Sequence, residues 1–215
     1  METVYGPIVI NLDSRQDRLK ITAGEFVSLS SNFQRLSAST GGATGCLDSH
    51  CRALENYLAA DTHKPAVMIC EDDVQFTVSR PIIDQHIREF MEHPTAKVAC
   101  LGFNAKRYEP YSSLYNRARD IQTRVCYIVK HEFAAELNQL WRQIYTARLS
   151  GKPLKWYDDV YRALPITNKT SDNYRGDQSW KILQQDTVFL TPKTRLAIQR
   201  PSYSDIELRN VNYRI

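Results

Sequence analysis

The sequence predicts an α/β fold in which a mainly parallel sheet is covered by helices on both faces. Short apolar runs of strand length alternate with longer segments whose apolar residues recur at helical spacing. Parallel strands need such intervening helices, which then cover the sheet from both sides. The patterns do not decide whether the strands near the carboxyl end are parallel or antiparallel. We therefore expect an α/β/α sandwich.

The first part of the chain is expected to supply three strands. Residues 7–12 form a buried-strand run, and a second strand over residues 33–38 ends in the loop 39–42. Residues 66–70 form the third apolar run. Helices are predicted over residues 15–29, from Thr44 onward and over residues 81–91. The helix from Thr44 has an apolar stripe at helical spacing: Leu47, Cys51, Leu54 and Leu58.

The remaining elements are predicted from the same two patterns. Strands are expected over residues 97–103, 123–129 and 187–190. Helices are expected over residues 132–149 and 177–184, the second after a loop rich in Asn, Ser, Thr, Asp and Gly. This alternation continues the α/β pattern of the first part.

Composition favours one globular domain spanning residues 1–215. Neither a linker nor a repeat divides the 215 residues. The net charge of +4 is mild and spread out, so nucleic acid is not the expected partner. No apolar stretch approaches the ~20 residues of a membrane span, and no signal-peptide pattern is present. The five cysteines lack Cys-x-x-Cys spacing and are expected to be free. We expect a cytoplasmic protein without an integral membrane segment.

Three consecutive carboxylates follow the third strand: Glu71, Asp72 and Asp73. In open α/β sheets, ligands bind beyond the carboxyl ends of the strands. Neighbouring carboxylates repel by about 1 kcal/mol per close pair in water, and by more where the dielectric constant falls. A hard divalent cation such as Mg²⁺ or Mn²⁺ would remove this repulsion, with its shell completed by substrate phosphates. The alternative interpretation is an acidic turn exposed to solvent.

Two common nucleotide-binding signatures are absent from the sequence. The first strand is not followed by Gly-x-Gly-x-x-Gly, and no phosphate-binding loop ending in Gly-Lys-Ser/Thr occurs. If phosphates bind here, the acids and a metal must hold them. Nucleotide-sugar transferases of the GT-A fold do this with an Asp-x-Asp motif, of which Glu71-x-Asp73 is a version.

Four blocks of the sequence, in order, resemble the family 25 glycosyltransferases, which include bacterial lipooligosaccharide galactosyltransferases and the collagen galactosyltransferases. The blocks are Ile10-Asn11-Leu12 with Arg15, Asp17 and Arg18; Gly45-Cys46 with Ser49-His50; Met68 to Val74; and Cys126 to Val129 with Ala134, Ala135 and Leu137. One departure is Asp48, where the family usually has an apolar residue.

The resemblance implies a GT-A-like fold and a metal-dependent hexosyltransferase. Its donor would be a nucleotide sugar, UDP-glucose or UDP-galactose, and its acceptor a glycan or glycoprotein. The cofactor would be Mn²⁺ or Mg²⁺, and the transfer would be inverting. Residues 1–103 would form the nucleotide-sugar half and residues 104–215 the acceptor half.

Candidate substrate-binding residues lie mainly at strand ends and helix starts. Asn11 and Asp13 are placed to meet the nucleoside, and Arg15 and Arg18 to offer guanidinium groups to a diphosphate or, alternatively, to pair with nearby aspartates on the surface. Ser49 and His50 lie in the first turns of a helix, a favourable place for an anion. The full set is Asn11, Leu12, Asp13, Arg15, Arg18, Ala38, Ser39, Thr40, Ser49, His50, Asp72 and Gln178.

Metal ligation and general-base catalysis are assigned to acids and one histidine. Asp73 is the predicted direct ligand, Glu71 acts directly or through water, and His131 completes the shell. The base that takes the acceptor proton is Asp177, or alternatively Asp158 beside Trp156. Asp177 also suits a helix cap, and Asp158 an ordinary charged helix face.

Other functions and surfaces also remain open. A nucleotidyltransferase or phosphohydrolase would use the same acids and metal, and a catalytically silent sugar-binding domain would keep only the fold. Arginines and tyrosines interleave over residues 104–124, which could bind a sugar, a diphosphate or nucleic acid, or form a solvated loop.

Overall fold

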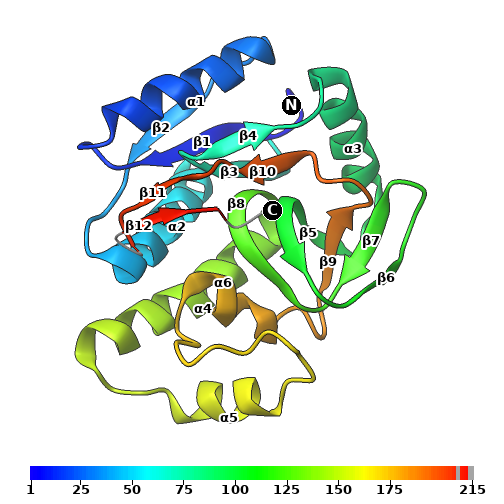
Figure 1. Cartoon of the computed structure of the whole chain (residues 1–215). Coiled ribbons are helices and arrows are strands. Elements are labelled where there is room, and N and C mark those ends of the chain that lie inside the picture. The colour runs from blue at the N-terminus through cyan, green and yellow to red at the C-terminus, as the bar shows by residue number, and fades with distance from the viewer. Residues whose placement is uncertain (207–208, 213–215) are drawn as a thin grey trace.

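The computed structural model describes residues 1–206 and 209–212, and its central feature is an eight-stranded sheet (Figure 1). The strand order is β2 (Gln34–Ser37), β1 (Tyr5–Asn11), β3 (Ala66–Glu71), β8 (Ile121–Lys130), β5 (Ala96–Ala105), β9 (Val188–Pro192), β7 (Tyr115–Ala118) and β6 (Tyr108–Pro110). Six of these eight strands point the same way, and β8 and β7 are reversed. The predicted α/β class with a mainly parallel sheet is confirmed.

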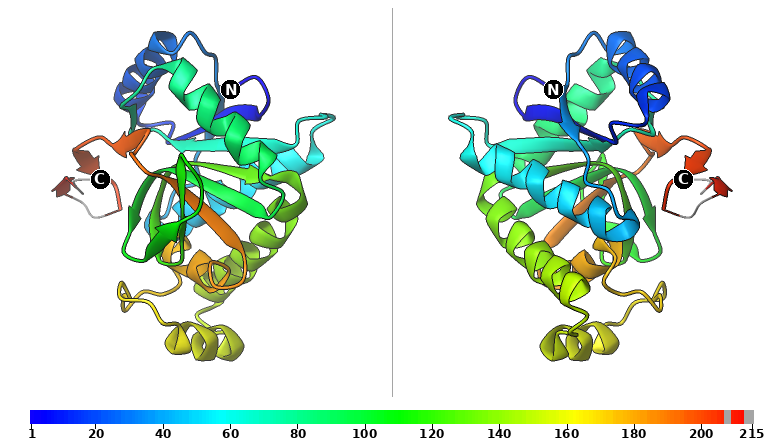
Figure 2. Two further views of the ribbon diagram at one scale, coloured as in Figure 1. Left: turned by 90° about the vertical axis from the view of Figure 1, so that its right-hand side faces the viewer. Right: turned by 90° about the vertical axis from the view of Figure 1, so that its left-hand side faces the viewer.

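Helices cover both faces of the sheet (Figures 1 and 2). The helices α1 (Gln16–Ser28) and α3 (Arg80–Glu92) pack on one face, and α2 (Gly42–Ala59) and α4 (His131–Ser150) on the other. Successive strand residues alternate between the two apolar cores: Val67 and Ile69 face α2 and α4, whereas Met68 and Cys70 face α1 and α3. Burial on both sides explains why these strands appear in the sequence as unbroken apolar runs.

The first three strands bring their carboxyl ends to one edge of the sheet. Strand β1 pairs in parallel with β2 and β3, with Asn11 beside Ser37 and Ile10 beside Glu71. The residues at and after these strand ends therefore meet: Asn11, residues 38–40 and the three acids. This junction is the base of the candidate site.

Strand β8 enters the sheet in the opposite direction. It lies between β3 and β5 and pairs antiparallel with both, with Cys126 opposite Cys70 and Lys130 opposite Ala66. Its amino end therefore lies near the acids, and its carboxyl end lies at the far edge. The predicted strand is correct, but its direction changes which residues reach the site.

Several elements were not predicted. The helix expected over residues 177–184 is a short helix α6 (Gly176–Ser179) followed by a 3₁₀ turn (Trp180–Ile182), and α5 (Lys155–Ala163) precedes them. Two additional pairs of short strands are present: β4 (Val74–Phe76) with β10 (Ala197–Gln199), and β11 (Ser202–Ser204) with β12 (Arg209–Val211).

The arginine- and tyrosine-rich segment forms the β6–β7 hairpin at the sheet edge, away from β1. Tyr115 is fully buried, and its hydroxyl donates to the His86 carbonyl at 2.8 Å. Arg117 and Arg119 lie 3.9 and 3.6 Å from the Glu109 carboxylate. Tyr115 is thus a core residue and not part of a stacking surface, and Arg117 and Arg119 pair with Glu109.

Within the part of the chain described, we find no helix with the length and apolar character needed to cross a membrane.

Candidate functional site

A pocket of about 500 Å³ lies at the edge where β1, β2 and β3 end. Its wall combines segments that are far apart in the sequence. They include residues 38–43, 71–73, 122–124, 175–178 and 204–206. The mixed sheet explains why these segments meet. The parallel strands β1, β2 and β3 end at this edge of the sheet, and the antiparallel strand β8 begins there.

Two of the three acids are buried and share one guanidinium. Asp72 and Asp73 are 6% and 5% exposed, and Arg18 Nη1 and Nη2 lie 2.6 and 3.0 Å from their carboxylates. Asn11 Nδ2 donates to Asp72 at 2.7 Å, and Gln199 Nε2 to Asp73 at 3.0 Å. These donors fix both carboxylates in position against the end of β3.

Burial raises the pKa of both buried aspartates to about 6. Removal from water disfavours the charged form, and for Asp73 the nearby Glu71 carboxylate adds repulsion. The Arg18 guanidinium opposes both effects without cancelling them. Near neutral pH the pair carries negative charge that Arg18 only partly compensates, so the site favours a further cation.

The donor set fits a hard divalent cation. Asp73 Oδ1 is buried and has no hydrogen-bond partner among the described residues, which leaves one carboxylate oxygen available for ligation. Glu71, with a side chain 22% exposed, lines the pocket next to it. Carboxylate oxygens with room for water and phosphate are what Mg²⁺ and Mn²⁺ prefer.

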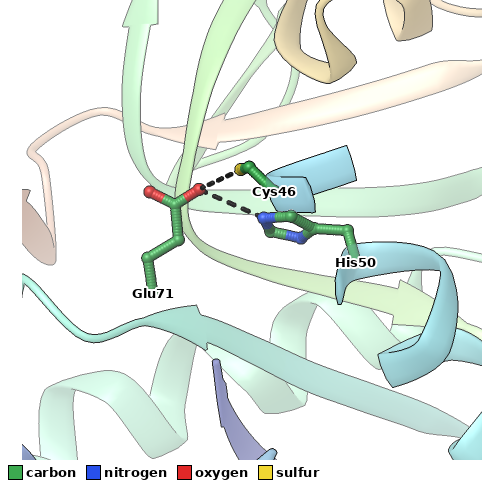
Figure 3. A group of neighbouring side chains, drawn as sticks. All are labelled: Cys46, His50 and Glu71. Atoms are coloured by element: carbon green, nitrogen blue, oxygen red, sulfur yellow. Dashed lines mark hydrogen bonds and ion pairs between the residues drawn. The ribbon is translucent and has the colours of Figure 1, made fainter. Parts of the chain in front are cut away.

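Two residues of α2 approach the same oxygen of the Glu71 carboxylate (Figure 3). His50 Nε2 lies 3.1 Å from Glu71 Oε1, and Cys46 Sγ lies 3.9 Å from the same oxygen. The other His50 nitrogen, Nδ1, is 2.8 Å from the Tyr127 hydroxyl. Together Cys46, His50 and Glu71 could contribute sulfur, nitrogen and oxygen atoms to a metal.

His50 is a neutral hydrogen-bonding residue in this arrangement. Complete burial, with the Arg124 charge nearby, lowers its pKa well below the usual value. Because a carboxylate can only accept, we infer that Nε2–H donates to Glu71 and that the Tyr127 hydroxyl donates to Nδ1. His50 therefore orients Glu71 toward the pocket.

The loop after β2 is anchored to the start of α2. The Ser39 amide donates to Ser49 Oγ at 2.8 Å, and the Ser39 hydroxyl donates to Asp48. Asp48 also accepts from Arg142 Nη1 of α4 at 2.5 Å. The acidic residue that departs from the family pattern thus joins the loop, α2 and α4.

Most of the predicted site residues line the pocket. They are Leu12, Arg18, Ala38, Ser39, Thr40, Ser49, His50, Glu71, Asp72, Asp73, Asp177 and Gln178. Gln178 has both ends of its amide occupied, by Tyr161 and Gln122, each at 2.9 Å. Ligand contact by these residues stays a prediction.

Three other predicted substrate residues lie outside the pocket lining. Asn11 is behind it, bonded to Asp72. Asp13 pairs with Arg35 and accepts from Ser37 Oγ at 2.7 Å. Arg15 pairs with Asp17 at 2.9 Å and with Asp205 at 2.5 Å. The structure therefore agrees with the alternative prediction, in which Arg15 pairs with aspartates at the surface.

The prediction that His131 completes the metal shell is wrong. It follows Lys130 at the carboxyl end of β8, which the antiparallel register places beside Ala66 at the start of β3. The acids are at the other end of β3, and the His131 ring packs 5.6 Å from the Tyr57 ring. Strand direction, which local sequence does not encode, caused the error.

Asp158, the alternative base, does not line the pocket. It lies in α5, and its Oδ1 accepts from Asn173 Nδ2 at 3.0 Å. Asp177 lies in the first turn of α6 at the pocket wall, 3.9 Å from Arg175 Nε. Of the two predicted bases, the structure places Asp177 alone in the pocket.

The sequence offered Arg124 only as part of the segment 104–124 that could bind a sugar or diphosphate, and it did not single out residues 204–206, yet both line the pocket. Arg124 lies in an apolar strand run, where an isolated charge signals a special environment. The segment 204–206 offered no such signal.

Comparison with known proteins identifies no close relative. No protein-family model matches the chain, and no match was found among curated proteins. Among solved structures, A197 from STIV is 9% identical with a TM-score of 0.48, covering 95% of this chain and 91% of that chain. A glycosyltransferase involved in glycosylation of the PBCV-1 major capsid is 12% identical with a TM-score of 0.43, covering 86% and 91%.

A third similar structure is mannose-1-phosphate geranyltransferase from Thermus thermophilus. It is 12% identical with a TM-score of 0.44, and the match covers 90% of this chain and 58% of that chain. Likeness at this level of identity carries no argument about activity, so the function is argued from the site.

Proposed function

We propose that this chain is a glycosyltransferase that moves a hexose from a nucleotide sugar, with UDP as nucleoside diphosphate, to a glycan or glycoprotein. The observation that carries the proposal is the placement of Asp73 and Glu71 in a pocket of about 500 Å³ at the strand ends. A pocket of this size accommodates a nucleotide sugar. The acids would repel a diphosphate, so this donor requires a bridging cation.

Asp73 Oδ1 and Glu71 would hold the cation, Mn²⁺ or Mg²⁺. When bound, such an ion neutralises charge on a departing diphosphate. Arg18 keeps both buried aspartates in place through its two nitrogens, at 2.6 and 3.0 Å. His50 keeps the Glu71 side chain turned to the pocket.

Asp177 is the proposed general base. It lies in the pocket wall contributed by a segment distant from the acids, where an acceptor hydroxyl can lie between it and the donor. Removal of the hydroxyl proton by the carboxylate while the hydroxyl attacks the anomeric carbon gives inversion of configuration.

Calorimetric titration with UDP and GDP, each with and without Mn²⁺, tests the proposal. We expect UDP binding that needs Mn²⁺ and is lost in Asp73→Asn, while Asp61→Asn, an exposed change outside the pocket lining, behaves as wild type. Equal affinity for GDP would exclude the UDP assignment. Hydrolysis of ordinary nucleoside triphosphates would favour the phosphohydrolase alternative, and absence of all nucleotide binding the silent sugar-binding domain.

A further inference from the structure

Arg124 is a buried cation that forms no direct ion pair with the residues that the structure describes, although the Glu71 and Asp177 carboxylates lie near enough to act on its charge. The residue is 5% exposed, and its Nη1 has no hydrogen-bond partner in that part of the chain. Nη2 lies 3.3 Å from Cys46 Sγ, and the guanidinium carbon lies 5.0 Å from the centre of the Trp141 ring. Within residues 1–206 and 209–212, no carboxylate oxygen lies within 4.0 Å of its nitrogens.

Burial disfavours the Arg124 charge, but the nearby Cys46, Glu71 and Asp177 side chains outweigh it and raise the pKa of the guanidinium. A guanidinium stays charged at all accessible pH values, so it cannot escape burial by losing its proton. A thiol and an aromatic face satisfy it only weakly compared with a carboxylate or phosphate. Buried charges normally form direct ion pairs, and a buried guanidinium at a pocket wall with an unbonded nitrogen points to a ligand that supplies a direct anionic partner.

The surrounding backbone is adapted to this side chain. A Cβ atom added to Gly176 would lie 2.2 Å from Arg124 Nη1, so a side chain there would displace the guanidinium from its present position. Gly176 and Arg124 both line the pocket, next to Asp177. Gly176 therefore leaves room for the guanidinium in the pocket wall, where the unbonded Nη1 is available to an oxyanion.

We propose that Arg124 is an anion-binding residue of the pocket, which takes a phosphate or carboxylate group of the bound substrate directly. This subsite differs from the cation position at Asp73, because Arg124 comes from β8 and contacts Cys46 of α2, whereas Asp73 follows β3. The two positions together would hold a substrate at two charged points.

Titration of the full chain with inorganic pyrophosphate in the presence of EDTA tests the subsite without relying on the proposed function. We expect Arg124→Met to weaken pyrophosphate binding at least tenfold and Arg124→Lys to weaken it less. The matched control is Arg162→Gln, which removes one charge from a side chain that is 78% exposed and outside the pocket lining. Unchanged binding in Arg124→Met would overturn the proposal.

Thermal unfolding distinguishes binding from a structural role. If Arg124 is kept for a ligand, Arg124→Met without anions should unfold at the same or a higher temperature than wild type, and pyrophosphate should stabilise wild type only. A marked loss of stability in Arg124→Met together with retained pyrophosphate binding would make the Arg124 contacts with Trp141 and Cys46 structural.

Titration with nucleotide sugars identifies which group of the substrate binds Arg124. This experiment rests on the proposed function. If Arg124 takes the diphosphate, Arg124→Met should weaken UDP and UDP-glucose but not uridine. If it takes a sugar carboxylate, only UDP-glucuronate should lose affinity. Pyrophosphate binding through Arg124 in a protein that binds no UDP would refute the proposed function and leave this subsite standing.

Discussion

At the scale of single residues, the acids differ in environment although they are adjacent in sequence. Asp72 and Asp73 are buried against Arg18, whereas Glu71 reaches the pocket and is held by His50. The sequence predicted a site at these acids, because three carboxylates directly after an apolar strand repel one another at an unusual electrostatic cost. It did not predict which of them Arg18 would bind, because that depends on how α1 packs.

The raised pKa of Asp73 gives a pH-dependent prediction. Its folded-state pKa of about 6 exceeds the usual value of 3.8, so the native state binds the proton more tightly than the unfolded state does. Its contribution to stability is therefore present below pH 4 and lost as pH rises through 6. Asp73→Asn, which cannot ionise, should gain on the order of 2–3 kcal/mol relative to wild type between about pH 4 and 7.

Urea unfolding of both proteins at several pH values measures this difference. Taking the difference between the two proteins removes the contributions of other carboxylates, several of which have lowered pKa values. A difference that does not change with pH would mean that Asp73 is ionised normally in the folded protein.

The general-base assignment gives a second residue-scale prediction. Asp177→Asn should lower the rate of sugar transfer by about 10²- to 10⁴-fold while metal-dependent UDP binding persists. Asp158→Asn, altered outside the pocket, serves as the control and should keep the wild-type rate. Steady-state kinetics with a responsive acceptor measures both variants. The reverse result would transfer the role to Asp158.

At the scale of elements, the close contact between the 38–41 loop and α2 determines the shape of the pocket. A Cβ atom on Gly45 would lie 2.1 Å from the Thr40 carbonyl oxygen, so the helix can approach the loop only with glycine there. Gly45→Ala should displace the loop, lower the free energy of unfolding by about 1–3 kcal/mol, and weaken donor binding.

The matched control for Gly45→Ala is Gly24→Ala in α1. An added Cβ there meets nothing within 4 Å, so this variant should be stabilised by about 0.5–1 kcal/mol through helix propensity. Chemical denaturation and donor titration of both variants provide the comparison. Wild-type donor affinity in Gly45→Ala would show that the loop has no part in the site.

Strands that are buried on both faces could be predicted from the sequence, whereas strand direction could not. Strands β1, β3 and β5 are buried on both faces, so they stand out as apolar runs. The direction of β8 is set by its pairing partners, which local sequence does not contain, and for this reason His131 was predicted in the wrong place. Strands of three residues such as β4 and β10 are too short to show a period.

At the scale of the whole molecule, the division into a donor half and an acceptor half does not follow a structural boundary. Strand β8, from the second half, pairs with β3 and β5 of the first. A fragment of residues 1–103 would lack it, and β5 would lose its partner toward β3. We expect this fragment alone to be insoluble and to show no cooperative unfolding.

Co-expression of residues 1–103 with residues 104–215 should restore a soluble complex, because the missing strand is then supplied. The control is a chain divided after Gly151, an exposed turn between α4 and α5, which should assemble more readily. A cooperative thermal transition for the 1–103 fragment alone would contradict this prediction.

The interior position of β8 also has a consequence for self-association. Unpaired strand edges act as templates for other chains, and natural proteins protect them. The residues of β3 and β5 that face β8 are almost wholly apolar and fully buried from Ala66 to Cys70 and from Val98 to Leu101. Separation of this one strand would expose two such edges at once. Aggregation of this protein should therefore begin with the release of β8, and conditions that keep it paired should keep the protein monodisperse.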